Sequence, residues 1–275
     1  MYSIDDLLTL MTRLREPTYG CPWDQVQTYK TIASSTLEEA YEVVDAIEQG
    51  DKQQLREELG DLLFQVIFYS ELGREESAFD FSSIVSELTA KLIRRHPHVF
   101  PEGTLDSRIS PNTSQAERDE AEANIKASWE AIKRQEREAK GHVSLLDDVP
   151  SAFPAVVRAA KLQKRAAGIG FDWPNSHGVY DKLAEEIAEL KVAQADNDKS
   201  AMEDELGDVL FSAINLSRHL KIDPESALRR ANSKFEQRFR DMEHQALLDN
   251  VDISTLDDQQ LDSLWRQAKV RHQKS

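Results

Sequence analysis

The chain has 275 residues, and 50 acidic against 34 basic side chains give it a formal net charge of −16. Such a surface repels phosphate backbones and anionic lipids, so we expect neither nucleic acid nor a membrane surface as a partner. Charged residues make up 31% of the chain, whereas only 10 glycines and 9 prolines are present, which predicts long helices, and the length favours two compact units.

The N-terminal segment is not expected to be a targeting sequence, because Asp5 and Asp6 stand where a secretory signal has positive charge. The longest strongly apolar stretch, residues 62–69, has eight residues, whereas a membrane-spanning helix needs roughly 20. The single cysteine, Cys21, cannot form a disulfide within the chain, which is typical of a reducing compartment. We therefore expect the protein to remain in the cytoplasm.

Two acidic helices are predicted in the first half of the chain. Glu38 and Glu42 lie on one helical face, with Glu39 three residues before Glu42. On the next helix Glu58 and Asp61 share a face. At about 100° per residue, apolar side chains fill most of the circumference outside this acidic stripe. We therefore expect the second helix to be buried nearly all round, with all these acids converging inside a bundle.

The burial of these acids decides their chemistry. Exposed charge is the norm, so a solvated acidic face is the competing interpretation. Buried, unpaired carboxylates would instead cost several kcal/mol each, which requires a cation among them. Ligation by oxygen without Cys or His selects Mg²⁺ or Mn²⁺ over zinc. A di-iron bundle would need Glu-x-x-His, and no histidine of this chain has a glutamate three residues before it.

Basic and aromatic side chains follow the acidic helices. Lys91 and Arg95 form an i, i+4 pair, which predicts either a phosphate clamp or a solvated basic face. Residues 110–140 are predicted to form a loop and then a charged, exposed helix. Trp129 and Lys133 form another i, i+4 pair there. This pair can stack a base and meet a phosphate, although a tryptophan more often belongs to a core or a docking surface.

The second half of the chain repeats the acidic motifs of the first. Residues 204–212 match residues 57–65 at six of nine positions, and the Glu-Glu-x-x-Glu pattern returns at residues 185–189. In both copies fifteen residues separate this pattern from the glutamate of the next motif. Chance rarely preserves two motifs together with their spacing, so a duplicated module is predicted. The matching carboxylates are Glu185, Glu186, Glu189, Glu205 and Asp208.

Each copy has a glycine in the middle of its second acidic helix, Gly60 in the first and Gly207 in the second. A glycine there costs about 1 kcal/mol relative to alanine. Its presence indicates a close backbone approach or room for a ligand, with a plain packing role as an equal alternative.

The end of the second copy is rich in basic and aromatic side chains. Arg230, Lys234 and Arg238 fall on successive helical turns. Trp265 and Lys269 lie on a short final helix that is expected to dock on the rest of the chain. Beside a metal ion these side chains would bind phosphate and base, and a solvated basic face with a docking tryptophan is the alternative. Neither a Walker A motif nor a strand followed by Gly-x-Gly-x-x-Gly is present, which excludes the familiar α/β nucleotide folds.

These motifs closely resemble those of the MazG nucleoside triphosphate pyrophosphohydrolases. The resemblance rests on the tandem acidic motifs, on Gly-Cys-Pro-Trp-Asp at residues 20–24 and on Lys-Leu-Ile-Arg-Arg-His-Pro-His-Val-Phe at residues 91–100. It implies an all-α fold of two tandem helical bundle modules, a homodimer, and hydrolysis of nucleoside triphosphates to monophosphate and pyrophosphate with Mg²⁺ or Mn²⁺. The implied metal ligands are Glu38, Glu39, Glu42, Glu58 and Asp61 in the first copy and Glu185, Glu186, Glu189, Glu205 and Asp208 in the second.

The resemblance also implies roles for particular parts of the chain, with the second copy as the active one. Residues 1–109 are an N-terminal MazG-like repeat, residues 110–147 a charged linker and residues 148–275 a C-terminal repeat. House-cleaning of the nucleotide pool is the expected role. A non-catalytic nucleotide-binding scaffold and a pyrophosphohydrolase of another phosphorylated nucleotide are the alternatives. The implied catalytic residues are Glu185, Glu186, Glu205, Lys234 and Arg238, and the implied substrate contacts are Arg230, Lys234, Arg238, Trp265 and Lys269.

Overall fold

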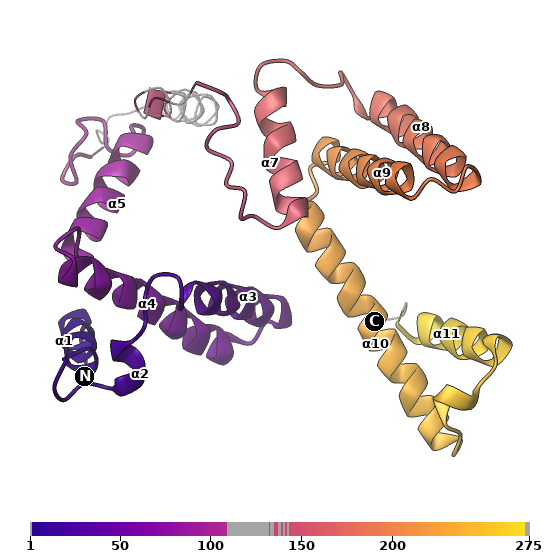
Figure 1. Cartoon of the computed structure of the whole chain (residues 1–275), viewed down its shortest axis with the longest axis horizontal. Helices are drawn as coiled ribbons and strands as arrows, with labels where there is room; N and C mark the ends of the chain where they lie inside the picture. The colour runs from indigo at the N-terminus through magenta and orange to yellow at the C-terminus, as the bar shows by residue number, and fades with distance from the viewer. Residues whose placement is uncertain are drawn as a thin grey trace. The chain divides into compact units, whose positions relative to one another are not determined.

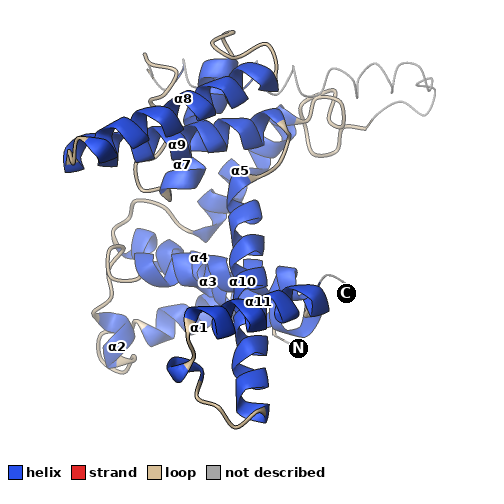
Figure 2. Cartoon of the chain, turned by 90° about the vertical axis from the view of Figure 1, so that its right-hand side faces the viewer, coloured by secondary structure: helices blue, strands red, loops and turns tan. Residues whose placement is uncertain are grey.

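The computed structural model describes residues 2–108, 132, 135–136, 139, 141 and 143–272. Its regular elements over these residues are all helices (Figure 2), which confirms the all-α prediction. The chain divides into two compact units, Met1–Lys133 and Arg134–Ser275. Trp129 and Lys133 lie outside the described residues, as does most of the predicted loop and helix at 110–140.

The helices of each unit follow one another in chain order (Figure 1). The first unit contains α1 (Ile4–Leu14), α2 (Pro22–Gln25), α3 (Ala33–Gln49), α4 (Lys52–Glu75) and α5 (Phe81–Arg95). The second unit contains α7 (Ala155–Ala167), α8 (Ser176–Ala195), α9 (Lys199–His219), α10 (Pro224–Leu248), the 3-10 helix η1 (Ile253–Thr255) and α11 (Asp258–His272).

Each unit is built around a helical hairpin, α3–α4 in the first unit and α8–α9 in the second (Figure 1). Gly50 ends α3 in the left-handed conformation, with φ of 74°, and the side chain of Asp51 caps the first turn of α4. Asn197, with φ of 54°, and Asp198 hold the same places between α8 and α9. Short turns of this kind fix the register of the two helices. The acidic motifs of each hairpin are therefore held opposite one another.

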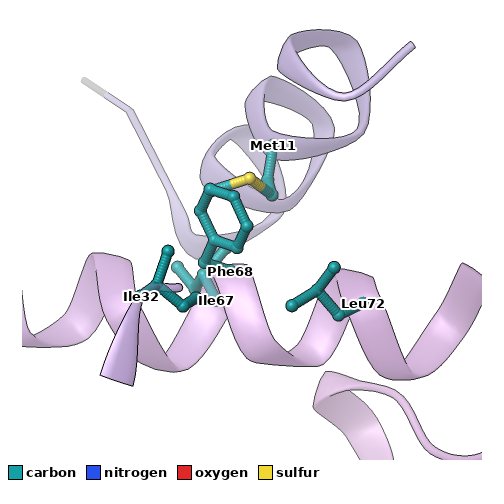
Figure 3. Packing of buried hydrophobic residues seen from close by; sticks show 5 residues of the cluster. All are labelled: Met11, Ile32, Ile67, Phe68 and Leu72. Carbon is teal, nitrogen blue, oxygen red and sulfur yellow. The ribbon is translucent and has the colours of Figure 1, made fainter. Parts of the chain in front are cut away.

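The hydrophobic core of the first unit lies against the C-terminal half of α4 (Figure 3). Ile67 and Phe68 of α4 meet Met11 of α1 and Ile32, which stands just before α3, and none of these four side chains is more than 3% exposed. Leu72 extends the cluster by one turn. This core fixes α1 on α4 but does not reach the half of α4 that carries the acidic motif.

The acidic half of α4 is open on its apolar side. Leu59 is 49% exposed and Leu63 37%, and in α9 Leu206 is 49% and Leu210 58% exposed. The expectation that α4 is buried nearly all round is therefore wrong for the single chain, and α9 is open in the same way. The apolar pattern shows which positions avoid water, but the described neighbours within each unit cover only part of the helix circumference.

The last helix of the chain docks on α10, as predicted. Ala268 of α11 is fully buried, and Nε of Arg271 lies 2.7 Å from Oδ2 of Asp241 on α10. α11 packs on the middle and C-terminal half of α10 (Figures 1 and 2), where Trp265 meets Phe235 and Arg238. Among the described residues, no helix combines the length and the apolar character needed to cross a membrane.

Candidate metal and nucleotide site

Both hairpins bring carboxylates from their two helices together, at matching positions of the duplicated motifs. In each case three residues offer carboxylate oxygens that all lie within 4.8 Å of one another. These are Glu39, Glu58 and Asp61 in the first unit, the first cluster, and Glu186, Glu205 and Asp208 in the second unit, the second cluster.

The donor set of both clusters fits a hard divalent cation. Each cluster offers three carboxylate oxygens on two packed helices, with no sulfur or nitrogen donor among them. Mg²⁺ and Mn²⁺ favour oxygen ligands, and Mg²⁺ usually retains several positions for water and substrate phosphates. Three protein oxygens would leave such positions open. The clusters therefore fit a metal ion that meets its substrate at the same site.

The other motif carboxylates lie at the edge of the clusters. The side chain of Glu42 interacts with that of Glu58, and the side chain of Glu189 interacts with that of Glu186, and each interaction raises the pKa of the first residue named. The structure thus brings three of the five predicted ligands of each copy into a cluster and places one more beside it. The first glutamate of each motif is exposed and is not a member of the three-residue clusters. These two residues are Glu38 and Glu185.

Like charges surround the carboxylates of the first cluster. Burial, followed by repulsion from Asp61 and the neighbouring glutamates, raises the pKa of Glu39. Burial and the nearby Glu58 also raise the pKa of Glu42. A divalent cation would reverse this effect, because it favours the charged form of every carboxylate around it.

The second cluster contains a cation that belongs to the chain. Nζ of Lys182 lies 2.8 Å from Oε1 of Glu186 and 2.9 Å from Oε1 of Glu185. The hydrogen bond to Glu186 is the main reason why the pKa of Lys182 is raised above its usual range. The side chain of Glu186 is only 6% exposed. The side-chain interaction with Glu186, which favours the protonated, hydrogen-bond-donating form of Glu189, is the main cause of the raised pKa of Glu189.

Lys182 is not among the site residues predicted from the sequence. A signal was present, since Lys182 stands four residues before Glu186 and therefore on the same helical face. The corresponding position before Glu39 is Ser35, so a search for features shared by the two copies passes over the lysine.

The glycines of the acidic helices face open space. A Cβ built on Gly60 or on Gly207 has no other atom of the described chain within 4 Å, apart from its own helix and immediate neighbours. A close approach by the chain's own backbone is therefore not the reason for these glycines. Of the predicted explanations, room for a ligand remains, and a second chain could occupy the same space.

Of the predicted basic and aromatic substrate contacts of the second copy, the structure brings only Arg238 and Trp265 into contact with each other. The guanidinium of Arg238 lies 5.8 Å from the ring centroid of Trp265, which joins α10 to α11. Arg230, Lys234 and Lys269 are exposed. α11 packs on α10 (Figure 1), and the ring contacts of Trp265 are with Phe235 and Arg238 of α10, not with the second cluster.

The basic pair of the first copy, Lys91 and Arg95, lies in the last two turns of α5. Both side chains are half-buried, and α5 packs against α4. Their position on α5 matches that of Lys234 and Arg238 on α10, one helix after the acidic hairpin.

Comparison with known proteins decides the family. The model of the MazG nucleotide pyrophosphohydrolase domain matches the chain twice, over residues 27–100 and 175–242. The chain belongs to the MazG family. Each match contains one complete acidic hairpin, so the duplication predicted from the motifs is a tandem pair of MazG domains.

Two relatives match the chain over nearly its whole length, and a third matches part of it. The nucleoside triphosphate pyrophosphohydrolase of Escherichia coli (strain K12) is 46% identical over 271 residues, which is 98% of each chain. The nucleoside triphosphate pyrophosphohydrolase/pyrophosphatase MazG of Thermotoga maritima is 40% identical over 265 residues, 96% of this chain and 95% of the relative. The nucleoside triphosphate pyrophosphohydrolase of Mycolicibacterium smegmatis is 33% identical over 165 residues, 60% of this chain and 46% of the relative.

Proposed function

We propose that the chain hydrolyses nucleoside triphosphates to nucleoside monophosphate and pyrophosphate in a reaction that needs Mg²⁺ or Mn²⁺. Membership of the MazG family and the names of the full-length relatives support the reaction. The observation that carries the metal requirement is the cluster of three carboxylates that recurs in both hairpins. A triphosphate entering a chain of net charge −16 needs such an ion to offset the repulsion.

In the proposed mechanism the second cluster holds the metal ion, which supplies charge neutralisation for the phosphates when it is bound. Lys182 leaves Glu186 and turns its ammonium group to the phosphate oxygens. Lys234 and Arg238 neutralise the remaining phosphoryl charge. One of the two glutamates outside the cluster, Glu185 or Glu189, accepts the proton of the attacking water.

The proposed active form is a homodimer in which each site draws on both chains. The open apolar faces of α4 and α9, including Leu59 and Leu210, need a cover, and a second copy supplies one with matching helices. The same assembly would let Trp265 and Lys269 of one chain reach the second cluster of the other.

The two copies have different proposed roles. The second copy carries turnover, because it combines the cluster with Lys182 and with the basic turns of α10. The first copy retains a cluster and acts mainly in stability and assembly. The physiological role is removal of unwanted triphosphates from the cytoplasmic nucleotide pool, with no nucleic acid as a partner.

A product analysis tests the reaction. The full-length protein is incubated with canonical and damaged nucleoside triphosphates and Mg²⁺, and the products are identified by ion-exchange chromatography and mass spectrometry. We expect monophosphate and pyrophosphate, loss of activity in excess chelator, and recovery on adding Mg²⁺ or Mn²⁺. Release of orthophosphate with a diphosphate product, or full activity in excess chelator, would contradict the proposal.

A further inference from the structure

The two clusters differ in one charged neighbour. Lys182 stands four residues before the ligand Glu186, and Ser35 stands four residues before the matching ligand Glu39. The lysine contacts Glu186 at 2.8 Å, whereas serine is neutral. The second copy therefore has a built-in cation at a position where the first copy has none.

The contact engages the most buried carboxylate of the second cluster. The side chain of Glu186 is 6% exposed, while that of Lys182 is 37% exposed. Charge interactions at a buried group are screened less by solvent and salt than those at the surface. A divalent cation that enters the cluster must share Glu186 with the ammonium group and is repelled by it over a distance of a few ångströms.

Building on the proposed metal-dependent reaction, we infer that Lys182 competes with the divalent cation for the second cluster, so that this cluster binds the cation alone more weakly than the first cluster does. The cation and a triphosphate then bind to the second cluster together. The first cluster binds its cation without this coupling.

The coupling follows from the mobility of lysine. The ammonium group sits on a flexible four-carbon stem, so it can exchange Glu186 for a phosphate oxygen without a movement of α8. A triphosphate that draws Lys182 away removes the competitor and tightens cation binding. By linkage, the cation tightens triphosphate binding by the same factor.

Mn²⁺ binding to each cluster separately tests the inference, because it does not depend on activity. In full-length protein, Glu58→Gln with Asp61→Asn disables the first cluster, and Glu205→Gln with Asp208→Asn disables the second. Free Mn²⁺ is followed by electron paramagnetic resonance during titration. In the protein that retains only the second cluster, we expect Lys182→Met to lower the Kd for Mn²⁺ by about fivefold, the size of a modest charge interaction.

Two matched variants control the measurement. Lys191→Met removes the same charge from another position on α8, and it should leave the Kd nearly unchanged. Ser35→Lys, in the protein that retains only the first cluster, should raise the Kd by about fivefold. A triphosphate analogue with a methylene group between its α and β phosphorus atoms should tighten Mn²⁺ binding more in the protein with Lys182 than in the Lys182→Met variant.

The outcomes separate this inference from the proposed function. If Mn²⁺ binds the second cluster and Lys182→Met leaves its Kd unchanged or raises it, the competition is refuted while the metal-dependent reaction stands. If neither cluster binds Mn²⁺ and hydrolysis continues in excess chelator, both the proposed metal site and the inference fail.

Discussion

Arg218, at the end of α9, forms a two-point ion pair with Asp172 in the loop that leads into α8. Its Nη1 lies 2.8 Å from Oδ2 of Asp172, and its Nη2 contacts Oδ1. The first unit has a corresponding ion pair in which the arginine and the acid have exchanged places. Arg15, just after α1, donates to Glu75 near the end of α4, and its Nε and Nη2 lie 2.8 Å from Oε1 and Oε2 of Glu75. In both copies an ion pair therefore connects the segment before the first acidic helix to the end of the second acidic helix. The residues that form the pair are not at matching positions of the two copies.

The Asp172 tie predicts a dependence of stability on pH. The hydrogen bond from Arg218 is the main reason why the pKa of Asp172 is lowered. A carboxyl group with a lowered folded pKa contributes stability above its unfolded value, about 3.9, and loses it as the pH falls through the folded value. Asp172→Asn should therefore lower the free energy of unfolding by about 1 kcal/mol at neutral pH, with a smaller difference below about pH 4. Urea unfolding at a series of pH values measures it.

Asp181→Asn, at an exposed acid of α8, is the control for this measurement and should show no such trend. A difference between Asp172→Asn and the unaltered protein that stays constant through the acid range would contradict the assigned role of the ion pair.

The open face of α9 predicts association. Leu210 is 58% exposed, and its replacement by glutamate places a charge on a surface that a second chain should cover. Light scattering is expected to show a mass of about twice 31.3 kDa for the unaltered protein, and a mass near that of one chain for Leu210→Glu. Val143→Glu, at a 98% exposed loop position, should remain dimeric. A stable monomer of the unaltered protein at micromolar concentration would refute this expectation.

Mixing two inactive variants tests whether the site is shared between chains. Glu205→Gln removes a charged ligand from the hairpin, and Lys269→Ala removes a cation from α11. If each site combines the hairpin of one chain with α11 of the other, a mixed dimer contains one intact site. Random exchange of subunits should then restore about a quarter of the unaltered activity. Mixtures that stay inactive after verified exchange would place the complete site within one chain.

The glycine of α9 predicts a steric effect on turnover. Gly207→Ala should leave circular dichroism unchanged, and it should strengthen the isolated helix by about 1 kcal/mol because alanine favours helices. The added methyl group projects into the open space beside Asp208, where we expect substrate or the partner chain. We therefore expect kcat/KM to fall by about tenfold through misplacement of the reacting groups. Gly60→Ala in the first copy is the matched control and should leave kcat/KM nearly unchanged.

Much of the fold followed from the sequence because the signals are local. The helices and the docked final helix rest on patterns within about twenty residues of one another, and the duplication rests on the same local motif recurring later in the chain. The proximity of Glu39 to Glu58 and Asp61 was also predictable from the sequence, because two consecutive helices joined by a short turn pack against each other.

The features that the sequence did not predict depend on neighbours that a helical pattern does not identify. The apolar pattern of α9 predicts that Leu210 packs against another surface. The pattern does not show that no helix of the same unit covers this side chain, which is 58% exposed. The contact between Arg238 and Trp265 depends on how the segment containing η1 turns α11 back onto α10, which no local motif encodes. Lys182 was not predicted because the predicted site consists of residues that the two copies share, whereas the matching residue of the first copy is Ser35.

The last prediction divides catalysis between the copies. Both have a cluster of three carboxylates, so the difference must come from their surroundings. Only the second cluster has Lys182 beside it, and its copy continues into the basic turns of α10. Glu205→Gln or Asp208→Asn should therefore abolish most turnover, at a cost of several kcal/mol in transition-state stabilisation if the metal ion is lost. Glu58→Gln and Asp61→Asn should leave much of the turnover and act on stability or assembly. Steady-state rates at saturating Mg²⁺, with circular dichroism to confirm folding, make the comparison. Silencing by the first-copy substitutions together with mild effects of the second-copy ones would reverse the assignment of the active site.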